Sequence, residues 1–323
     1  MLDRLKGRRF LVIGRVGMDL TPMPPGTRTR EATEMMVSMG GSSANIAAGL
    51  VKLGGTASLV TCVSDDAVGW YCEDQLDAYD IERVHVRRVK GEARTSLALV
   101  EARVAEHQSV IYRNNAADFR MNVEDVEAVD YTRFDAVITT GTVFAAEPSR
   151  AAAFRAFELA RAAGLPVIFD VDYRPYSWPS PQVASEVLSR AGALADVIVG
   201  NDEEFGFMAG GIEKGFAHAR ALAESSDLVV YKMGPEGAVT FAGGEELRTG
   251  IYPVDALKPT GAGDSFMAGL ISGLAEARPL REAVLRGSAC ASIVVARPGC
   301  APAMPDPAEL QAFLDTHPGP TQG

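Results

Sequence analysis

Short apolar runs alternate with longer amphipathic stretches through the second half of the chain. Apolar runs bounded by turn-forming residues are typical of buried strands, whereas apolar positions spaced three and four apart are typical of helices. We predict strands at 136–140, 167–171, 197–200 and 228–232, and helices at 149–163, 184–195 and 215–225. This alternation predicts an α/β fold built on a parallel sheet.

The first third of the chain follows a different pattern. The apolar run 10–14 predicts a buried strand and 43–53 predicts a helix, but the stretch 21–30 is polar and rich in proline, which cannot continue a helix. We predict further strands at 33–39, 95–104 and 109–113. Because these three lie outside the α/β repeat, we expect them to form a small β-sheet that stands off the main sheet and acts as a lid.

The last part of the chain predicts an antiparallel hairpin around Gly243 and Gly244. Helices rich in small residues are predicted at 262–276 and 280–296, and a short one near 308–314. We find neither an internal repeat nor a linker between domains. We therefore expect one domain over residues 1–323, with the lid formed by segments of about 15–40 and 94–115.

Composition narrows the class of partner. Lys and Arg total 31 against 42 Asp and Glu, a formal net charge of −11, which disfavours nucleic acid and acidic membranes. No apolar run approaches the ~20 residues of a membrane span, and the polar start Met1–Arg9 lacks the apolar core of a signal peptide, so we expect a cytoplasmic protein. The four cysteines show no CxxC spacing, which argues against a zinc site or a redox pair.

A glycine-rich segment, Thr260-Gly261-Ala262-Gly263-Asp264, precedes a predicted helix. Unpaired backbone N–H groups at a helix N-terminus attract anions, and glycines let a phosphate approach them closely. A carboxylate there would repel phosphate, so Asp264 is best interpreted as a general base for an attacking hydroxyl. On this segment alone, a glycine-rich turn with a helix cap explains the pattern about as well.

A second glycine-rich segment, 39–47, also runs into a helix but lacks the spacing of a Walker loop or a dinucleotide fingerprint. Gly40 and Gly41 would allow close backbone contact with a polyol, and the Asn45 amide offers a donor and an acceptor to hydroxyls. Asp19 follows just past the first strand, where α/β sheets place ligands, and its carboxylate can accept two sugar hydroxyls. A turn with a cap and a solvated loop aspartate are the competing interpretations.

The order and separation of three segments resemble those of ribokinase-like (PfkB-type) carbohydrate kinases over essentially the whole chain: GxxxxD at 14–19, GGSSAN at 40–45 and TGAGD at 260–264. The resemblance implies a three-layer α/β sandwich with a mostly parallel central sheet and a small β-sheet lid. It also implies ATP and Mg²⁺ as cofactors. Asp264 would be the catalytic base, and Gly261, Ala262 and Gly263 the anion hole for the transferred phosphoryl group.

Further segments resemble the family's nucleotide and metal sites. The resemblance assigns five residues to ATP and its metal, the latter held largely through water: Asn201, Glu204, Lys232, Gly234 and Gly237. Asp172 stands where the family's DxNxR stretch usually has asparagine. A carboxylate at that position would favour a metal more strongly.

The residue before the anion hole departs from the family pattern. Many members carry an aspartate three residues before the first glycine of GAGD, where it helps to hold an activating monovalent cation. This chain has Lys258 there. We expect the lysine ammonium to replace that cation electrostatically, so that no added monovalent cation is required.

Longer strings resemble a subgroup of kinases that act on keto-deoxy sugar acids: 14–20, 111–118, 172–178, 288–295 and 303–305. The carboxylate of such a substrate favours a guanidinium fork, particularly on an acidic protein. Arg113 in the lid, Arg15 beside the first strand and Arg174 are the candidates, and we expect Arg113 first. A surface position or a phosphate contact is the competing interpretation of each arginine.

Other classes remain open at this point. Family members also act on fructose, nucleosides or 2-keto-3-deoxygluconate, and the Tyr-Arg pair at 112–113 fits kinases of the last of these as well. A nicotinamide-dependent oxidoreductase has a similar sheet, but no GxGxxG opens a helix after the first strand. A sugar-binding regulator would not need Asp264, Asn201 and Glu204. None of the four histidines falls in a motif, and the exposed lid strands favour a homodimer through the lid.

Overall fold

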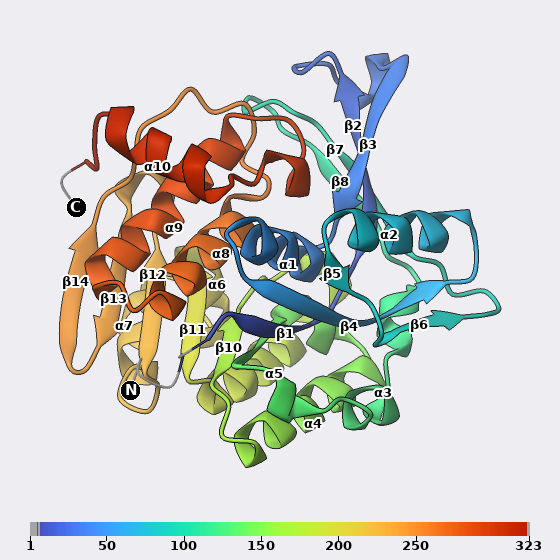
Figure 1. The fold of residues 1–323 in the computed structure, drawn as a ribbon, viewed down its shortest axis with the longest axis horizontal. Helices are drawn as coiled ribbons and strands as arrows, with labels where there is room; N and C mark the ends of the chain where they lie inside the picture. Colours follow the sequence, from blue (N-terminus) through green and yellow to red (C-terminus); the bar gives the residue numbers. More distant parts are fainter. Residues whose placement is uncertain (1–4, 6, 322–323) are drawn as a thin grey trace.

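The computed structural model describes residues 5 and 7–321, and Figure 1 shows its fold. Residues 1–4 and 6, which make up much of the polar start Met1–Arg9, lie outside the described residues. Of the helices that the structure describes, none is both long and apolar enough to cross a bilayer.

A large sheet forms the centre of the fold, with the strand order β14-β13-β12-β11-β10-β9-β1-β4-β5, and β6 pairs with β4. Neighbouring strands are parallel except at the β12-β13-β14 end, which is antiparallel. The strands are β1 Arg9–Ile13, β4 Thr56–Ser64, β5 Ile81–Glu82, β6 Val86–Val89, β9 Ala136–Thr140, β10 Val167–Asp170, β11 Val197–Asn201, β12 Leu228–Lys232, β13 Ala238–Ala242 and β14 Glu245–Thr249. The predicted, mostly parallel sheet is confirmed.

Helices cover both faces of this sheet and complete three layers (Figure 1). One face packs against α1 Ser42–Lys52, α2 Ala67–Ala78, α8 Ala262–Ala275, α9 Leu280–Val295 and α10 Pro307–Thr316. The other packs against α3 Val123–Glu127, α4 Ser149–Ala162, α5 Pro181–Leu194, α6 Asp202–Ala209 and α7 Gly215–Leu222. Successive residues of β1 alternate between the two apolar clusters, Leu11 in one and Val12 in the other. Because both faces are buried, the central strands are apolar throughout, and the sequence reveals them clearly.

A separate four-stranded sheet, called the small sheet below, projects from the main body (Figure 1). Its order is β3-β2-β7-β8, with β2 Gly17–Met23, β3 Glu34–Gly40, β7 Ser96–Val100 and β8 Ser109–Tyr112. The sequence predicts three of these strands but not β2. Asp19 is buried inside β2, opposite Ser38 and Ala98, so the competing interpretation of a solvated loop aspartate is wrong. Pro22 obscures β2 in the sequence, yet it lies beyond the stretch paired with β7, where its missing N–H breaks no central ladder.

The chain order reverses at β1, which has β4 on one side and β9 on the other. Open α/β sheets bind ligands beyond the carboxyl ends of their strands at such a reversal. β1 ends at Ile13, so Gly14 and Arg15 follow at this edge, and β9 ends there at Thr140. The topology therefore predicts a ligand site next to Arg15.

Candidate active site

One cavity of about 960 Å³ brings the predicted site residues together. It is bounded by the carboxyl ends of the central strands, the start of α8 and one face of the small sheet. The predicted residues that line it are Arg15, Asp19, Gly41, Asn45, Arg113, Asp172, Arg174, Asn201, Glu204, Lys232, Gly234, Gly237, Lys258, Gly261, Ala262, Gly263 and Asp264. Gly40 is a predicted site residue that does not line it.

Gly40 contacts Asp19 rather than the cavity. A Cβ on Gly40 would lie 1.9 Å from a carboxylate oxygen of Asp19, so only glycine lets β3 pass this close. Burial raises the pKa of Asp19 to about 6, although the charges of Arg15 and Lys258 oppose this rise. Asp19 makes no hydrogen bond to any described side chain, and its carboxylate is therefore available to a ligand in the cavity.

Asp264 lies in the first turn of α8, directly behind the glycine-rich segment. Gly261 precedes the helix with φ of 87°, and a Cβ there would lie 2.9 Å from Sγ of Cys300, so backbone conformation and space both require glycine. Asn45 Nδ2 donates a hydrogen bond of 2.8 Å to Asp264 Oδ2. Burial, and next the negative charge of Asp172, raise the pKa of Asp264 to about 6. A carboxylate with this pKa is ionised at neutral pH and can accept a proton.

The start of α8 faces Lys232, the last residue of β12. Its Nζ lies 3.5 Å from the place that a Cβ on Gly263 would take, and 5.7 Å from the centroid of the Phe266 ring. The positive N-terminal end of α8 and the lysine ammonium thus border the same space. Together they form a site suited to an anionic group such as phosphate.

Two buried acids lie on the other side of Lys232. Burial raises the pKa of Asp170 and of Glu204, and the charge of Lys232 opposes both rises. Asn201 and Glu204 also cap α6: Asn201 Oδ1 accepts from the Glu204 N–H at 2.8 Å, and Glu204 Oε2 accepts from the Asn201 N–H at 2.7 Å. The described residues contain no group of three or more His, Cys, Asp or Glu that could hold a metal.

Asp172 is already engaged by protein groups. Its Oδ1 forms an ion pair of 2.8 Å with Nη2 of Arg174, and its Oδ2 accepts from Ser42 Oγ at 2.5 Å. The charge of Asp172 is the largest cause of the raised pKa of Arg174. Asp172 thus connects α1, Arg174 and the electrostatics of Asp264, while its predicted metal contact stays a prediction.

Lys258 is buried, with 1% of its surface exposed. Its Nζ donates to the backbone carbonyls of Thr260, at 2.6 Å, and Val294, at 3.1 Å. Desolvation lowers the pKa of Lys258, and the nearby acidic groups oppose this. Backbone carbonyls also bind monovalent metal ions in proteins, so the Lys258 ammonium lies in an environment of the kind that binds such ions.

His107 is a cavity residue that no sequence motif indicates. It lies between β7 and β8, and its Nε2 is 3.3 Å from Thr260 Oγ1, next to the anion-hole glycines. Its Nδ1 is 2.9 Å from the carbonyl oxygen of Glu101. A carbonyl only accepts, so Nδ1 carries a proton and donates to Glu101. The contact with Thr260 joins the small sheet to the start of α8.

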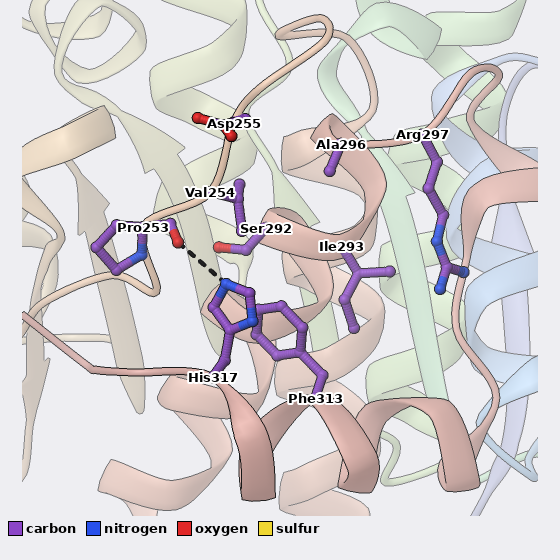
Figure 2. Close-up of a pocket in the computed structure, with 9 residues that line it drawn as sticks. All are labelled: Pro253, Val254, Asp255, Ser292, Ile293, Ala296, Arg297, Phe313 and His317. Atoms are coloured by element: carbon purple, nitrogen blue, oxygen red, sulfur yellow. Dashed lines mark hydrogen bonds between the residues drawn. The ribbon is translucent and has the colours of Figure 1, made fainter.

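A second hollow of about 530 Å³ lies between α9, α10 and residues 253–255 (Figure 2). His317 Nε2 is 3.1 Å from the carbonyl oxygen of Pro253, and its ring stacks on Phe313 with centroids 4.1 Å apart. Pro253, Val254 and Ser292 line both hollows. No predicted site residue lines the second hollow, so we assign the chemistry to the main cavity.

Comparisons with known proteins find relatives over nearly the whole chain. The model of the pfkB family carbohydrate kinases matches residues 8–307. The 5-dehydro-2-deoxygluconokinase of Photobacterium profundum is 35% identical over 312 residues, covering 95% of this chain and 94% of that protein. The enzyme of the same name from Geobacillus kaustophilus is 34% identical over 321 residues, covering 98% and 96%.

Solved structures show the same fold. The fructokinase from Vibrio cholerae O395, in a fructose, ADP and calcium ion bound form, has a TM-score of 0.84 at 25% identity, covering 96% of this chain and 99% of that one. The aminoimidazole riboside kinase from Salmonella enterica has a TM-score of 0.80 at 23% identity, covering 95% and 100%. The three-layer fold predicted from the sequence is thereby confirmed.

Proposed function

The chain belongs to the pfkB family of carbohydrate kinases and uses ATP, and we propose that its substrate is 5-dehydro-2-deoxy-D-gluconate. The enzyme phosphorylates the 6-hydroxyl of this sugar acid in myo-inositol catabolism. One observation carries the proposal: a carboxylate with a raised pKa, Asp264, stands at a helix N-terminus in a cavity that also contains several arginines. The names of the relatives that cover nearly the whole chain support it.

Asp264 acts as the general base. The terminal hydroxyl of the sugar donates its proton to this carboxylate as its oxygen attacks the γ-phosphoryl group of ATP. The hydrogen bond from Asn45 occupies Asp264 Oδ2 and orients the carboxylate, which leaves Oδ1 for the substrate. Gly41 borders the sugar, Gly40 lets β3 pass close to Asp19, and Asp19 accepts the hydroxyls of the sugar.

The transferred phosphoryl group lies against the backbone N–H groups of Gly261, Ala262 and Gly263. Lys232 adds a positive charge on the opposite side, and such preorganised groups stabilise charge that develops in the transition state. Gly234 and Gly237, in the turn after β12, border the nucleotide, whose base lies near 289–295 of α9.

Mg²⁺ bound with ATP would neutralise charge on the β- and γ-phosphates. Asn201, Glu204 and Asp172 are the residues that would hold it, largely through water. The absence of a protein cage among the described residues suits an ion that keeps several waters. Asp170, the first residue of the stretch that resembles DxNxR, lies close enough to Lys232 and Glu204 for their charges to shift its pKa, and belongs to the same group.

Lys258 makes a monovalent cation unnecessary in this proposal. Its ammonium contacts two backbone carbonyls beside the anion hole, and a fixed positive charge there substitutes for a bound ion. Turnover should therefore be the same with sodium, potassium or neither in the buffer. A strong potassium requirement would refute this part.

The small sheet acts as a lid and as a dimer interface. Asp19, Ala98 and Ile111, which pair across three strands, point into the cavity. The opposite face is apolar and outward, with Val37 47%, Val110 46% and Tyr112 58% exposed. A second copy of the chain is the partner that fits this face, since burial of the apolar side chains favours association. Light scattering of the purified protein tests for the dimer.

The substrate is tested by ADP release with magnesium-ATP and a panel of 5-dehydro-2-deoxygluconate, 2-keto-3-deoxygluconate, fructose and ribose. The proposal predicts the highest kcat/KM for 5-dehydro-2-deoxygluconate. In the NMR spectrum of the product, coupling to ³¹P should locate the phosphate on C6. A preference for 2-keto-3-deoxygluconate or fructose would keep the kinase and discard the proposed substrate. The Tyr112-Arg113 pair is the feature that keeps 2-keto-3-deoxygluconate as the second candidate.

A further inference from the structure

We propose that Arg15, rather than Arg113, is the receptor for the substrate's carboxylate, an inference that rests on the proposed sugar-acid substrate. Arg15, Arg113 and Arg174 all line the cavity. They differ in how many guanidinium donors the protein itself already uses or covers. That difference leaves one arginine free to bind an anion.

Arg113 is enclosed. Its Nη2 donates to the Asp118 carboxylate and, at 3.2 Å, to the carbonyl oxygen of Thr142, and both charged side chains of the pair are at most 5% exposed. Its guanidinium also stacks on Phe119, 4.1 Å from the ring centroid. The remaining donors, Nε and Nη1, are buried and make no hydrogen bond to the described residues. A substrate carboxylate at Arg113 would have to compete with Asp118, with which this guanidinium already forms a buried ion pair.

Arg174 is paired as well, although half-exposed. Nη2 of Arg174 forms an ion pair with Asp172 Oδ1, and Nη1 of Arg174 donates to the carbonyl oxygen of Tyr173 at 3.1 Å. Each terminal nitrogen of Arg174 thus already makes one contact with the protein, whereas only one terminal nitrogen of Arg15 does. The charge of Arg174 is also balanced by Asp172, which lowers its attraction for a second anion.

Arg15 has the opposite character. It is 7% exposed, its Nη1 donates to Ser96 Oγ at 2.9 Å, and no described carboxylate forms an ion pair with it. Unlike those of Arg113, its other donors are not sealed from solvent. A largely buried guanidinium without a paired acid is costly to keep in an empty site, and a bound carboxylate would remove that cost.

The placement of Arg15 suits a six-carbon acid whose far end reacts at Asp264. Arg15 follows β1 and is anchored to β7 of the small sheet by Ser96, whereas Asp264 belongs to α8. Its charge is near enough to lower the pKa values of Asp19 and Asp264. A carboxylate at Arg15, middle hydroxyls at Asp19 and a terminal hydroxyl at Asp264 would therefore span one continuous cavity.

The test compares two substrates that differ at one group, 5-dehydro-2-deoxygluconate and the corresponding alcohol with CH₂OH in place of the carboxylate. We expect Arg15→Met to raise KM for the acid by at least about 30-fold, because one partner of a buried charged pair is lost, and to change KM for the alcohol by less than about threefold. Arg15→Lys keeps the charge without the fork and should recover part of the loss. Assays at pH 8 keep Asp264 ionised in every variant.

Matched controls separate recognition from folding. Ser96→Ala removes the anchor but keeps the guanidinium, so its loss should be smaller than that of Arg15→Met. The double variant Arg113→Met with Asp118→Asn removes the alternative arginine together with its buried partner, and should leave the acid-over-alcohol preference intact. Circular dichroism and the KM for ATP verify that each variant is folded.

The outcomes distinguish a failure of the Arg15 assignment from a failure of the proposed substrate class. If the wild type prefers the acid, and the Arg113 double variant rather than Arg15→Met abolishes that preference, the assignment of Arg15 is wrong and the proposed substrate class stands. If the wild type turns over neutral sugars and no sugar acid, the proposed function fails, and the role of Arg15 fails with it.

Discussion

Replacing Asp264 by asparagine should stabilise the substrate-free protein at alkaline pH while it removes activity. The pKa of Asp264 rises from 3.8 in the unfolded chain to about 6 in the folded one, chiefly because the carboxylate is buried. The folded state therefore binds this proton more tightly than the unfolded state, and stability is lost as pH rises from about 4 through 6. At ~1.36 kcal/mol per pKa unit, the ionised carboxylate costs about 3 kcal/mol at pH 8.

This figure is an upper limit, because water in the cavity also solvates the carboxylate. At pH 5 the folded carboxylate is still protonated, so the cost is about half as large. Urea unfolding of both proteins at pH 5 and pH 8 measures the difference directly. The asparagine variant should gain more stability at the higher pH, whereas Asp74→Asn, at an exposed position of α2, should show no such pH dependence. Equal effects at both pH values would refute the assigned pKa shift.

Four other perturbations have defined outcomes. The kcat/KM of the wild type should rise as pH increases through about 6, where Asp264 ionises. Asp172→Asn should shift this rise to lower pH, because the charge of Asp172 raises the pKa of Asp264. A rise at the same pH in the variant would contradict the electrostatic coupling of the two carboxylates. Lys258→Met should reduce turnover and make it respond to added potassium, whereas a variant that keeps full activity in sodium would contradict the substitute-cation role. His107→Ala should raise KM for the sugar and increase ATP hydrolysis without sugar, as expected of a loosened lid; unchanged values would exclude the contact with Thr260 as a closure element. Val37→Glu should produce monomers in light scattering, and a persistent dimer would place the interface elsewhere.

The sequence predicts the central sheet well because its strands are buried on both faces. It does not predict β4, whose run Thr56–Ser64 contains several hydroxyl residues, since the partners of Ser58 and Ser64 lie far along the chain. Ser64 exchanges hydrogen bonds with Thr95, and Ser58 Oγ donates to the carbonyl oxygen of Glu82. Tertiary hydrogen bonds of this kind make a polar-looking segment a core strand.

The candidate site, too, is predicted from the sequence only where it depends on local structure. The glycine-rich segment before α8 predicts Asp264 because a helix N-terminus is local, and the structure brings it into one cavity with Lys232 and Asn45. The sequence could not rank the arginines, because the exposure of a guanidinium depends on contacts such as Arg113 with Asp118. It could not predict His107 either, since the Thr260 contact joins residues 153 apart.

The central claim is that Asp264 takes the proton from the sugar hydroxyl, and the most direct measurement is the kcat of Asp264→Asn on the best sugar of the panel. General-base catalysis contributes on the order of 10²–10⁴ in rate, so kcat should fall by that factor while calorimetry still shows binding of ATP and sugar. A kcat within about tenfold of the wild type, with binding intact, would contradict the account and require another base.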